Sequence, residues 1–286
     1  MVALVLLGFG GAFTRVAPAP EWDEKFTVGN SIHVWLNRPP SPIPKGRYVM
    51  VNPVLGAVRD LPPHTSNMMT AQERRRVLLQ DIDIVIDGGA NCGQYAKWMR
   101  ECGFRGTIVS FEPALETFAV LSEVARDDDD WYCRQEALGS EDGHATLNLT
   151  RTSLGSSIFR RTGLHAHIWP KDVDTGTETV PVRSLRSLWE ELGCDGKRVF
   201  LKLDVEGAEL SVLEGAGPVL GRVALLELEL PLVALHHDAP TLTEMLNFLA
   251  ERGFSTVALE QNHSGDEVTG QMLMIDGIFR SSANSS

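Results

Sequence analysis

The chain has 286 residues, of which 43% are hydrophobic and 22% charged, a balance typical of one folded domain with room for an appended segment. Its formal net charge of -12 argues against a nucleic-acid partner, because binding to a phosphate backbone requires clustered lysine and arginine. The cysteines form no CxxC pair, so the sequence indicates neither a disulfide framework nor a zinc site and fits a reducing compartment.

Residues 1–45 are predicted to form an N-terminal extension, or a lid, beside a main domain of residues 46–286. Six prolines between positions 18 and 44 remove backbone donors and disfavour long helices and central strands. The apolar stretch of residues 2–11 has no basic region before it and is much shorter than the roughly 20 residues of a membrane span. We therefore expect a cytoplasmic protein with no membrane partner.

From residue 47 onward, short apolar runs alternate with helical stretches, which predicts an α/β fold built from βαβ units around a mostly parallel sheet. Residues 70–80 read as a helix whose basic cluster, residues 74–76, would form a solvated face. A strand at 146–149 is expected as an insertion. The buried strands are predicted at residues 84–86, 107–111, 131–137, 199–203 and 223–230, and the crossover helices at 94–102, 115–125, 185–192 and 208–213.

The C-terminal elements indicate which kind of α/β fold this is. A helix over residues 242–252 leads through Gly253 into strands at 255–260 and 272–279, with no helix between the strands. Two strands joined in this way should pair as a hairpin. We therefore predict a mostly parallel seven-stranded sheet with an antiparallel last strand.

The segment Ile84–Gln94, IVIDGGANCGQ, is an apolar strand followed by a tight turn into a helix, which is typical of a cofactor loop. Gly89 would let the backbone pass beneath a ligand, and Gly93 would let the helix start close to the strand. The spacing D-x-G-x-x-x-G differs from the G-x-G-x-x-G of dinucleotide sites and favours a ligand without pyrophosphate, such as S-adenosylmethionine (SAM). Asp87 would accept hydrogen bonds from the methionine part of SAM, directly or through water, and Asn91 belongs to the same loop.

Two acids in the following loops extend the predicted cofactor site. Glu112 lies in a Phe-Glu-Pro sequence after the second strand, where an acid can bind two ribose hydroxyls, although an NAD site would use the same acid. One group at the exit of the third strand normally reaches the adenine edge. Glu136 is the first candidate for that contact, and the backbone of Ala137 is the second.

The segment Phe200–Leu210, FLKLDVEGAEL, carries the candidate chemistry. Lys202, Asp204 and Glu206 alternate, so on an extended strand they would project to one side, beside the cofactor. A lysine near Asp204 would favour the ionised form of that acid. The alternative is that Lys202 and Glu206 form a purely structural ion pair.

Together, residues 87–93, 111–113 and 202–209 resemble the FkbM family of SAM-dependent methyltransferases, which reads approximately DVGANxG, FEP and KIDVEGxE. The resemblance covers roughly Ile84–Met274. It implies a Rossmann-like class I methyltransferase fold, SAM as cofactor, and O-methylation of a sugar, a polyketide or another natural product, as in antibiotic biosynthesis. The departures at Gly88, Ala96 and Arg186 remove no cofactor group but leave the acceptor open.

Methyl transfer is an in-line displacement, so the enzyme must align the acceptor oxygen opposite the sulfur and take up its proton. Asp204 is counted among the cofactor-binding residues and is the preferred base, assisted by Lys202 or by His236 from the loop after the fifth strand. Glu227 and Glu229 share a strand face, and with Asp204 they could hold Mg²⁺, although no spacing demands a metal. The residues predicted to contact the acceptor are Glu206, Glu227, Glu229, Ser156 and His237.

Several alternatives stay open at this point. Ser156 belongs to a Gly/Ser loop, residues 153–157, that could equally be an ordinary flexible loop. His165, His167 and Trp169 could form part of an acceptor wall, without support from periodicity. The competing functions are an NAD-dependent oxidoreductase, which the loop spacing disfavours, and a non-catalytic SAM-binding module, which the acidic motif disfavours. The sequence leaves open which hydroxylated small molecule is the acceptor, and whether the protein is a homodimer.

Overall fold

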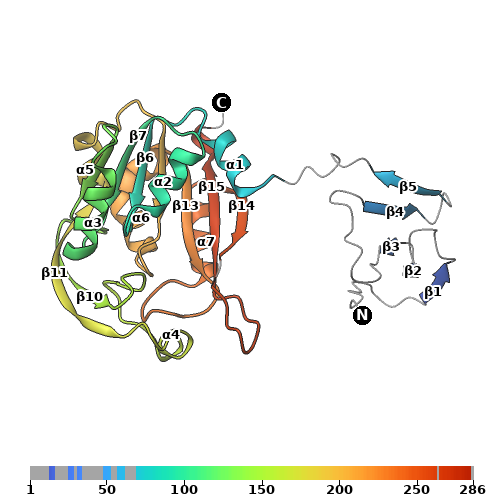
Figure 1. Ribbon diagram of the computed structural model, residues 1–286. Coiled ribbons are helices and arrows are strands. Elements are labelled where there is room, and N and C mark those ends of the chain that lie inside the picture. Colours follow the sequence, from blue (N-terminus) through green and yellow to red (C-terminus); the bar gives the residue numbers. More distant parts are fainter. Residues whose placement is uncertain are drawn as a thin grey trace. The chain divides into compact units, whose positions relative to one another are not determined.

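The computed structural model describes residues 69–262 and 264–284, together with five short strands nearer the N-terminus (Figure 1). The chain divides into the units Met1–Met69 and Thr70–Ser286. The apolar residues 2–11 lie outside the described residues, and the predicted boundary near residue 45, with its lid, stays a prediction. The first unit contains an antiparallel sheet of β1 (Phe13–Val16), β2 (Lys25–Val28) and β3 (Ser31–His33), and a hairpin of β4 (Tyr48–Asn52) with β5 (Ala57–Leu61).

A seven-stranded sheet with the order β14-β15-β13-β12-β6-β7-β8 forms the centre of the second unit (Figure 1). Strand β15 runs antiparallel to both of its neighbours, whereas the pairs from β13 to β8 are parallel. This confirms the predicted sheet and the C-terminal hairpin. The strands are β6 (Ile84–Gly88), β7 (Thr107–Phe111), β8 (Trp131–Arg134), β12 (Val199–Leu203), β13 (Val223–Pro231), β14 (Phe254–Gln261) and β15 (Met274–Ser281).

Helices cover both faces of this sheet, which explains why its central strands are continuous apolar runs. Successive side chains of a strand point to opposite faces, so Ile84 and Ile86 of β6 join one core cluster while Val85 joins the other. The first cluster includes residues of α5 (Leu185–Glu191), α6 (Glu209–Ala216) and α7 (Leu242–Glu251), and the second includes residues of α1 (Ala71–Leu78), α2 (Gln94–Glu101) and α3 (Leu115–Ala125). A 3₁₀ turn, Gly217–Arg222, precedes β13, and another, Ser282–Asn284, follows β15.

The predicted third strand, residues 131–137, is wrong as a single element. Strand β8 ends at Arg134, and β9 (Ala137–Gly139) belongs to a separate three-stranded sheet with β10 (Gly143–Thr150) and β11 (Asp174–Ser184). The inserted strand expected at residues 146–149 is confirmed within β10. Between β10 and β11 the chain forms α4 (Gly163–Ile168). The insertion therefore leaves the main sheet where β8 ends.

The basic cluster of α1, residues 74–76, is not a solvated face throughout, so that prediction is wrong in part. Arg76 is exposed, but Arg75 is only 1% exposed and pairs with Glu227 of β13 and Glu260 of β14. Arg75 occupies the position three residues before the buried Leu78, on the face that packs against the sheet. Within the described part of the chain, no helix is long and apolar enough to cross a membrane.

Candidate active site

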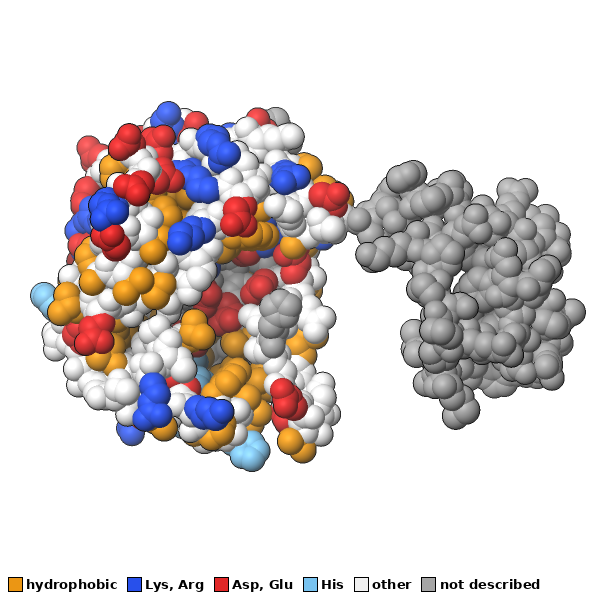
Figure 2. Space-filling model, in the orientation of Figure 1, with side chains coloured by type: hydrophobic (Ala, Val, Ile, Leu, Met, Phe, Trp, Pro, Cys, Tyr) orange, Lys and Arg blue, Asp and Glu red, His pale blue; other side chains and the backbone are white. Residues whose placement is uncertain are grey.

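A pocket of about 920 Å³ lies at the carboxyl ends of β6, β7, β12 and β13. This edge of a parallel sheet is where α/β proteins commonly bind ligands. Residues 152–158, 165 and 167–172 of the insertion form one wall, and residues 262 and 265–268, between β14 and β15, form another. Figure 2 shows a hollow in this face with acidic and hydrophobic side chains around it.

The loop after β6 has the backbone geometry that its sequence predicts. Gly89, Asn91 and Gly93 all have positive φ angles, of 72°, 47° and 84°. A Cβ atom on Gly89 would lie 1.8 Å from the carbonyl oxygen of Asp204, and one on Gly93 would lie 2.8 Å from the ring of Trp131. Glycine is therefore required at both positions by conformation and by close approach. Gly89 and Asn91 line the pocket, whereas Gly93 begins α2 away from it.

Asp87 does not line the pocket. Its carboxylate is 0% exposed, accepts a hydrogen bond from the Ser110 hydroxyl at 3.1 Å, and lies 3.2 Å from Nζ of Lys202. Lys202 in turn donates to the carbonyl oxygens of Gly88 and Gly89, at 3.4 and 3.2 Å. Asp87 therefore holds the lysine that fixes the loop, and its contact with the methionine part of SAM, directly or through water, stays a prediction.

Glu112 lies at the pocket wall between two backbone donors. Its carboxylate accepts hydrogen bonds from the N–H groups of Asn91, at 3.0 Å, and Ala114, at 2.9 Å. Burial raises the pKa of Glu112 to about 7, although these two bonds act in the opposite direction. Glu136 also lines the pocket and is paired with Arg134 at 2.9 Å. The roles of Glu112 in ribose binding and of Glu136 in adenine binding stay predictions.

The acidic motif turns sharply after β12. The strand ends at Leu203, and Glu206 has a φ angle of 54°, so Lys202, Asp204 and Glu206 do not continue along one extended face as expected. The alternative of an ion pair between Lys202 and Glu206 is also wrong. Lys202 lies 3.5 Å from a carboxylate oxygen of Asp204, besides its pair with Asp87. Burial alone would lower the pKa of Lys202, but these two carboxylates raise it, so the amine stays protonated.

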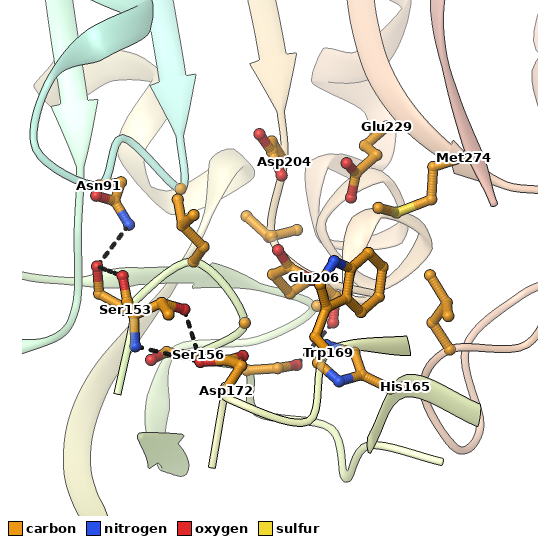
Figure 3. Close-up of a pocket in the computed structure, with 18 of the residues that line it drawn as sticks. Asn91, Ser153, Ser156, His165, Trp169, Asp172, Asp204, Glu206, Glu229 and Met274 are labelled. Carbon is orange, nitrogen blue, oxygen red and sulfur yellow. Dashed lines mark hydrogen bonds between the residues drawn. The ribbon is translucent and has the colours of Figure 1, made fainter. Parts of the chain in front are cut away.

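Three carboxylates face one another at the pocket wall (Figure 3). Asp204, Glu206 and Glu229 each contribute one carboxylate oxygen to a group of three atoms that all lie within 4.8 Å of one another. The side chain of Asp204 is 44% exposed. Burial and the neighbouring carboxylates raise the pKa values of Glu206 and Glu229 well above their ordinary range. Both acids are thus prone to hold a proton or to bind a cation.

Glu227 points away from this cluster, although it shares a strand with Glu229. Its carboxylate pairs with Arg75 and accepts a hydrogen bond from the Tyr95 hydroxyl at 2.6 Å. Of the two strand acids predicted to contact the acceptor, Glu229 lines the pocket, while the structure does not bring Glu227 to the wall.

The two predicted histidines differ from each other in environment. His236 is buried beside a smaller cavity of about 100 Å³, and its ring centre lies 5.6 Å from that of His165. Burial lowers the pKa of His236 to about 4, so the ring is neutral. His237 is exposed, and its backbone N–H donates to the carbonyl oxygen of Arg160. Neither histidine lines the larger pocket.

The pocket brings together most, but not all, of the predicted site residues. Among the described residues, those predicted to bind or react that line it are Gly89, Asn91, Glu112, Glu136, Ser156, Asp204, Glu206 and Glu229. Those that do not line it are Asp87, Gly93, Lys202, Glu227, His236 and His237.

The wall also contains residues that the sequence reasoning missed. Asp172 lines the pocket and accepts a hydrogen bond from the Thr152 hydroxyl at 2.6 Å. Asn262 donates to Glu229 at 3.0 Å, and Met274 lies beside the same acid (Figure 3). Asp172 and Asn262 come from loops and Met274 begins β15, and all three are remote in sequence from the motifs. The polar turn after β14 was the available signal, but a turn by itself does not indicate a ligand.

Comparison with solved structures gives distant likenesses. An rRNA methylase from Streptococcus thermophilus is 12% identical to this chain. The match covers 74% of this chain and 93% of the methylase, with a TM-score of 0.39. A Streptococcus pneumoniae protein in complex with S-adenosyl-L-methionine is also 12% identical, with 75% and 73% covered and a TM-score of 0.43. Likenesses at this level carry no information about the reaction.

Sequence comparison is more specific. A protein named Methyltransferase 1 from Beauveria bassiana (strain ARSEF 2860) is 27% identical over 151 residues, which are 47% of this chain and 59% of that protein. The match thus spans less than two thirds of that relative's length. The family model described as the Methyltransferase FkbM domain matches residues 87–256, which include the cofactor loop and the acidic motif.

Proposed function

We propose that this chain, which belongs to the FkbM methyltransferase family, is a SAM-dependent methyltransferase that methylates a hydroxyl oxygen of a small molecule. The observation that carries this proposal is the position of Asp204. Its half-exposed carboxylate stands on the pocket wall at the end of β12, with the protonated Lys202 behind it. A carboxylate in that position can accept the proton that a hydroxyl must lose.

The residues around the loop after β6 fit SAM. The positive φ angles of Gly89 and Asn91 turn the backbone around one end of the pocket, and Glu112 is held there by two N–H donors. Glu112 would accept the ribose hydroxyls, as an acid at the end of the second strand does in related sites. When bound, SAM supplies an electrophilic methyl group on a sulfonium.

The chain's own contribution is alignment and proton removal. The pocket walls would hold the acceptor oxygen opposite the sulfur, which accounts for the larger part of the rate gain. The carboxylate of Asp204 would take up the proton of the acceptor hydroxyl, while SAM, when bound, would supply the methyl group that replaces it. Lys202, ion-paired with both Asp87 and Asp204, holds the carboxylate of Asp204 in position.

The size and lining of the pocket support a small hydroxylated acceptor. Ligand pockets usually measure about 300–1,000 Å³, so about 920 Å³ leaves room for an acceptor beside the cofactor. Carboxylates on one side and Trp169 on another suit a ring with several hydroxyl groups (Figure 3). We extend the proposal to a sugar or an intermediate of secondary metabolism, such as an antibiotic precursor.

The partners and the location are part of the same proposal. The net charge of -12 supports an acceptor other than nucleic acid. A cytoplasmic location without a membrane partner remains our proposal, with free cysteines as its support.

The test is transfer of an isotope-labelled methyl group from SAM to a panel of hydroxylated acceptors by the full-length chain. We expect a methyl ether, identified by mass spectrometry and NMR. Asp204→Asn should retain SAM affinity and lose most of kcat, about 10²–10⁴-fold, whereas Glu251→Gln, on the exposed end of α7, should match the wild type. Methylation at nitrogen or carbon, or calorimetric binding of NAD without SAM, would refute the proposal.

A further inference from the structure

We propose that Asp204, Glu206 and Glu229 bind a divalent cation with oxygen ligands, of the Mg²⁺ or Mn²⁺ type, at the acceptor end of the pocket. The three carboxylates reach this point from two different strand ends, and their oxygen atoms lie within 4.8 Å of one another. Oxygens that share one ion with bonds of about 2.1–2.6 Å are separated by about 3–5 Å. The cluster therefore has the dimensions of a cation site before any rearrangement.

His236 provides an independent observation. Its side chain is 4% exposed, and its Nε2 atom has no hydrogen-bond partner, yet that atom faces Oε2 of Glu206 at 3.8 Å. A buried polar atom without a partner is costly, so its position requires an explanation. Carboxylates that ligate a metal are usually held by an outer hydrogen-bond donor. Nε2 stands where such a donor to Glu206 would be needed.

The charges around the cluster point in the same direction. Lys202 is already shared between Asp87 and Asp204. Within the described ranges, the ion pairs include no lysine or arginine on Glu206 or Glu229, and Glu229 receives a hydrogen bond from the neutral amide of Asn262 at 3.0 Å. Partly buried carboxylates that lie close together, as Glu206 and Glu229 do here, are normally paired or bound to a metal. A divalent ion would neutralise the negative charge of the cluster that Lys202 does not balance.

The role of the ion rests on the proposed function, but its binding does not. A cation at this point would hold the acceptor's hydroxyl oxygen and lower the pKa of that hydroxyl. The preferred acceptor would then carry two neighbouring oxygens able to bind one ion. An acceptor with a protonated amine is the competing occupant of the same cluster, and the experiment separates the two.

The experiment is a titration of the full-length chain with Mn²⁺, followed by electron paramagnetic resonance in the absence of SAM and acceptor. We expect one Mn²⁺ per chain that Mg²⁺ displaces. Glu229→Gln and Glu206→Gln should each weaken Mn²⁺ binding by at least about tenfold, and His236→Asn by about 10–100-fold. Glu267→Gln removes the same charge from an exposed position on the pocket rim and should leave the affinity unchanged.

Thermal unfolding and SAM affinity of each variant show whether it is folded, so a loss of Mn²⁺ in a folded Glu229→Gln protein supports the proposal. Failure of wild type to bind Mn²⁺, or equal loss in Glu267→Gln, overturns it. Methyl transfer to hydroxyls that persists in EDTA overturns the role of the ion in the reaction, and transfer that requires an amine on the acceptor overturns the metal. Both results leave the proposed function standing. Mn²⁺ binding without transfer to any hydroxyl supports the metal and contradicts the proposed function.

Discussion

Gly89 and Asp204 are in such close contact that a Cβ atom added to Gly89 would lie 1.8 Å from the carbonyl oxygen of Asp204. The cofactor loop after β6 and the acidic motif after β12 are therefore packed directly against each other. Lys202 strengthens this contact, because its Nζ atom donates to the carbonyl oxygen of Gly89 and pairs with Asp204. Any change that separates the two loops should affect cofactor binding and proton removal together.

Gly89→Ala should abolish SAM binding and destabilise the fold, because the new Cβ must displace the backbone at Asp204. The matched control is Gly196→Ala. Gly196 has the same φ angle of 72°, but its Cβ would meet nothing within 4 Å, so this variant measures backbone strain alone. Strain of that kind costs about 1–2 kcal/mol. Calorimetry and chemical unfolding should show the larger loss in Gly89→Ala; equal losses would contradict the role of close approach.

Lys202→Met should lower the free energy of unfolding by about 3–5 kcal/mol, because it leaves the fully buried Asp87 carboxylate without a countercharge. The double variant Lys202→Met/Asp87→Asn should recover much of that loss, since the buried charge is then removed. SAM affinity should fall in both proteins, because the bonds to Gly88 and Gly89 are lost in each. Denaturant unfolding of the wild type, the single variant and the double variant tests this expectation. A double variant no more stable than Lys202→Met would disprove the pairing of Lys202 with Asp87.

Much of this fold could be predicted because its signals are local. The apolar run of residues 199–203 is both the predicted and the observed strand β12, and residues 115–125 agree equally well with α3. Such runs and helical periods depend on a few neighbouring residues. The break between Arg134 and Ala137 could not be seen in the same way. It arises because β9 pairs with β11, about 45 residues further along the chain, and leaves the main sheet.

The site was predicted where it depends on a motif and missed where it depends on a distant partner. The motifs identified Glu112 and Asp204, which do line the pocket. They did not show that Asp87 is paired with Lys202, because the direction of a side chain at a strand end depends on its neighbouring strands. Arg75 and Glu227 are 152 positions apart, so no local pattern connects them.

SAM affinity should decrease as the pH falls below about 7, because the pKa of Glu112, raised to about 7 by burial, makes its carboxylate protonated there. A protonated acid has less capacity to accept hydrogen bonds from two ribose hydroxyls. Glu112→Gln should bind SAM weakly and lack this pH dependence. Calorimetric titrations at pH 5.5, 7 and 8.5 test the expectation, and an unchanged pH profile in the variant would rule out Glu112 as the titrating group.

The same carboxyl should affect the stability of the ligand-free protein with the opposite sign. An acid whose pKa is raised from 4.5 to about 7 binds its proton more tightly in the folded state. Its contribution to stability is therefore complete below pH 4.5 and decreases as the pH rises to 7. The Tm of the wild type, relative to that of Glu112→Gln, should decrease over this range. A difference that grows with pH would contradict the assigned direction.

Arg75→Met should lower the free energy of unfolding by about 3–5 kcal/mol, because Glu227 would remain buried with Tyr95 as its remaining bonded partner. Arg76→Met is the control on the same helix; Arg76 is exposed, so its loss should change stability by no more than about 0.5 kcal/mol. Glu227→Leu in the Arg75→Met background should recover part of the loss by removing the buried charge. If Arg75→Met and Arg76→Met unfold at the same denaturant concentration, then the pair between α1 and β13 does not stabilise the sheet that carries Glu229.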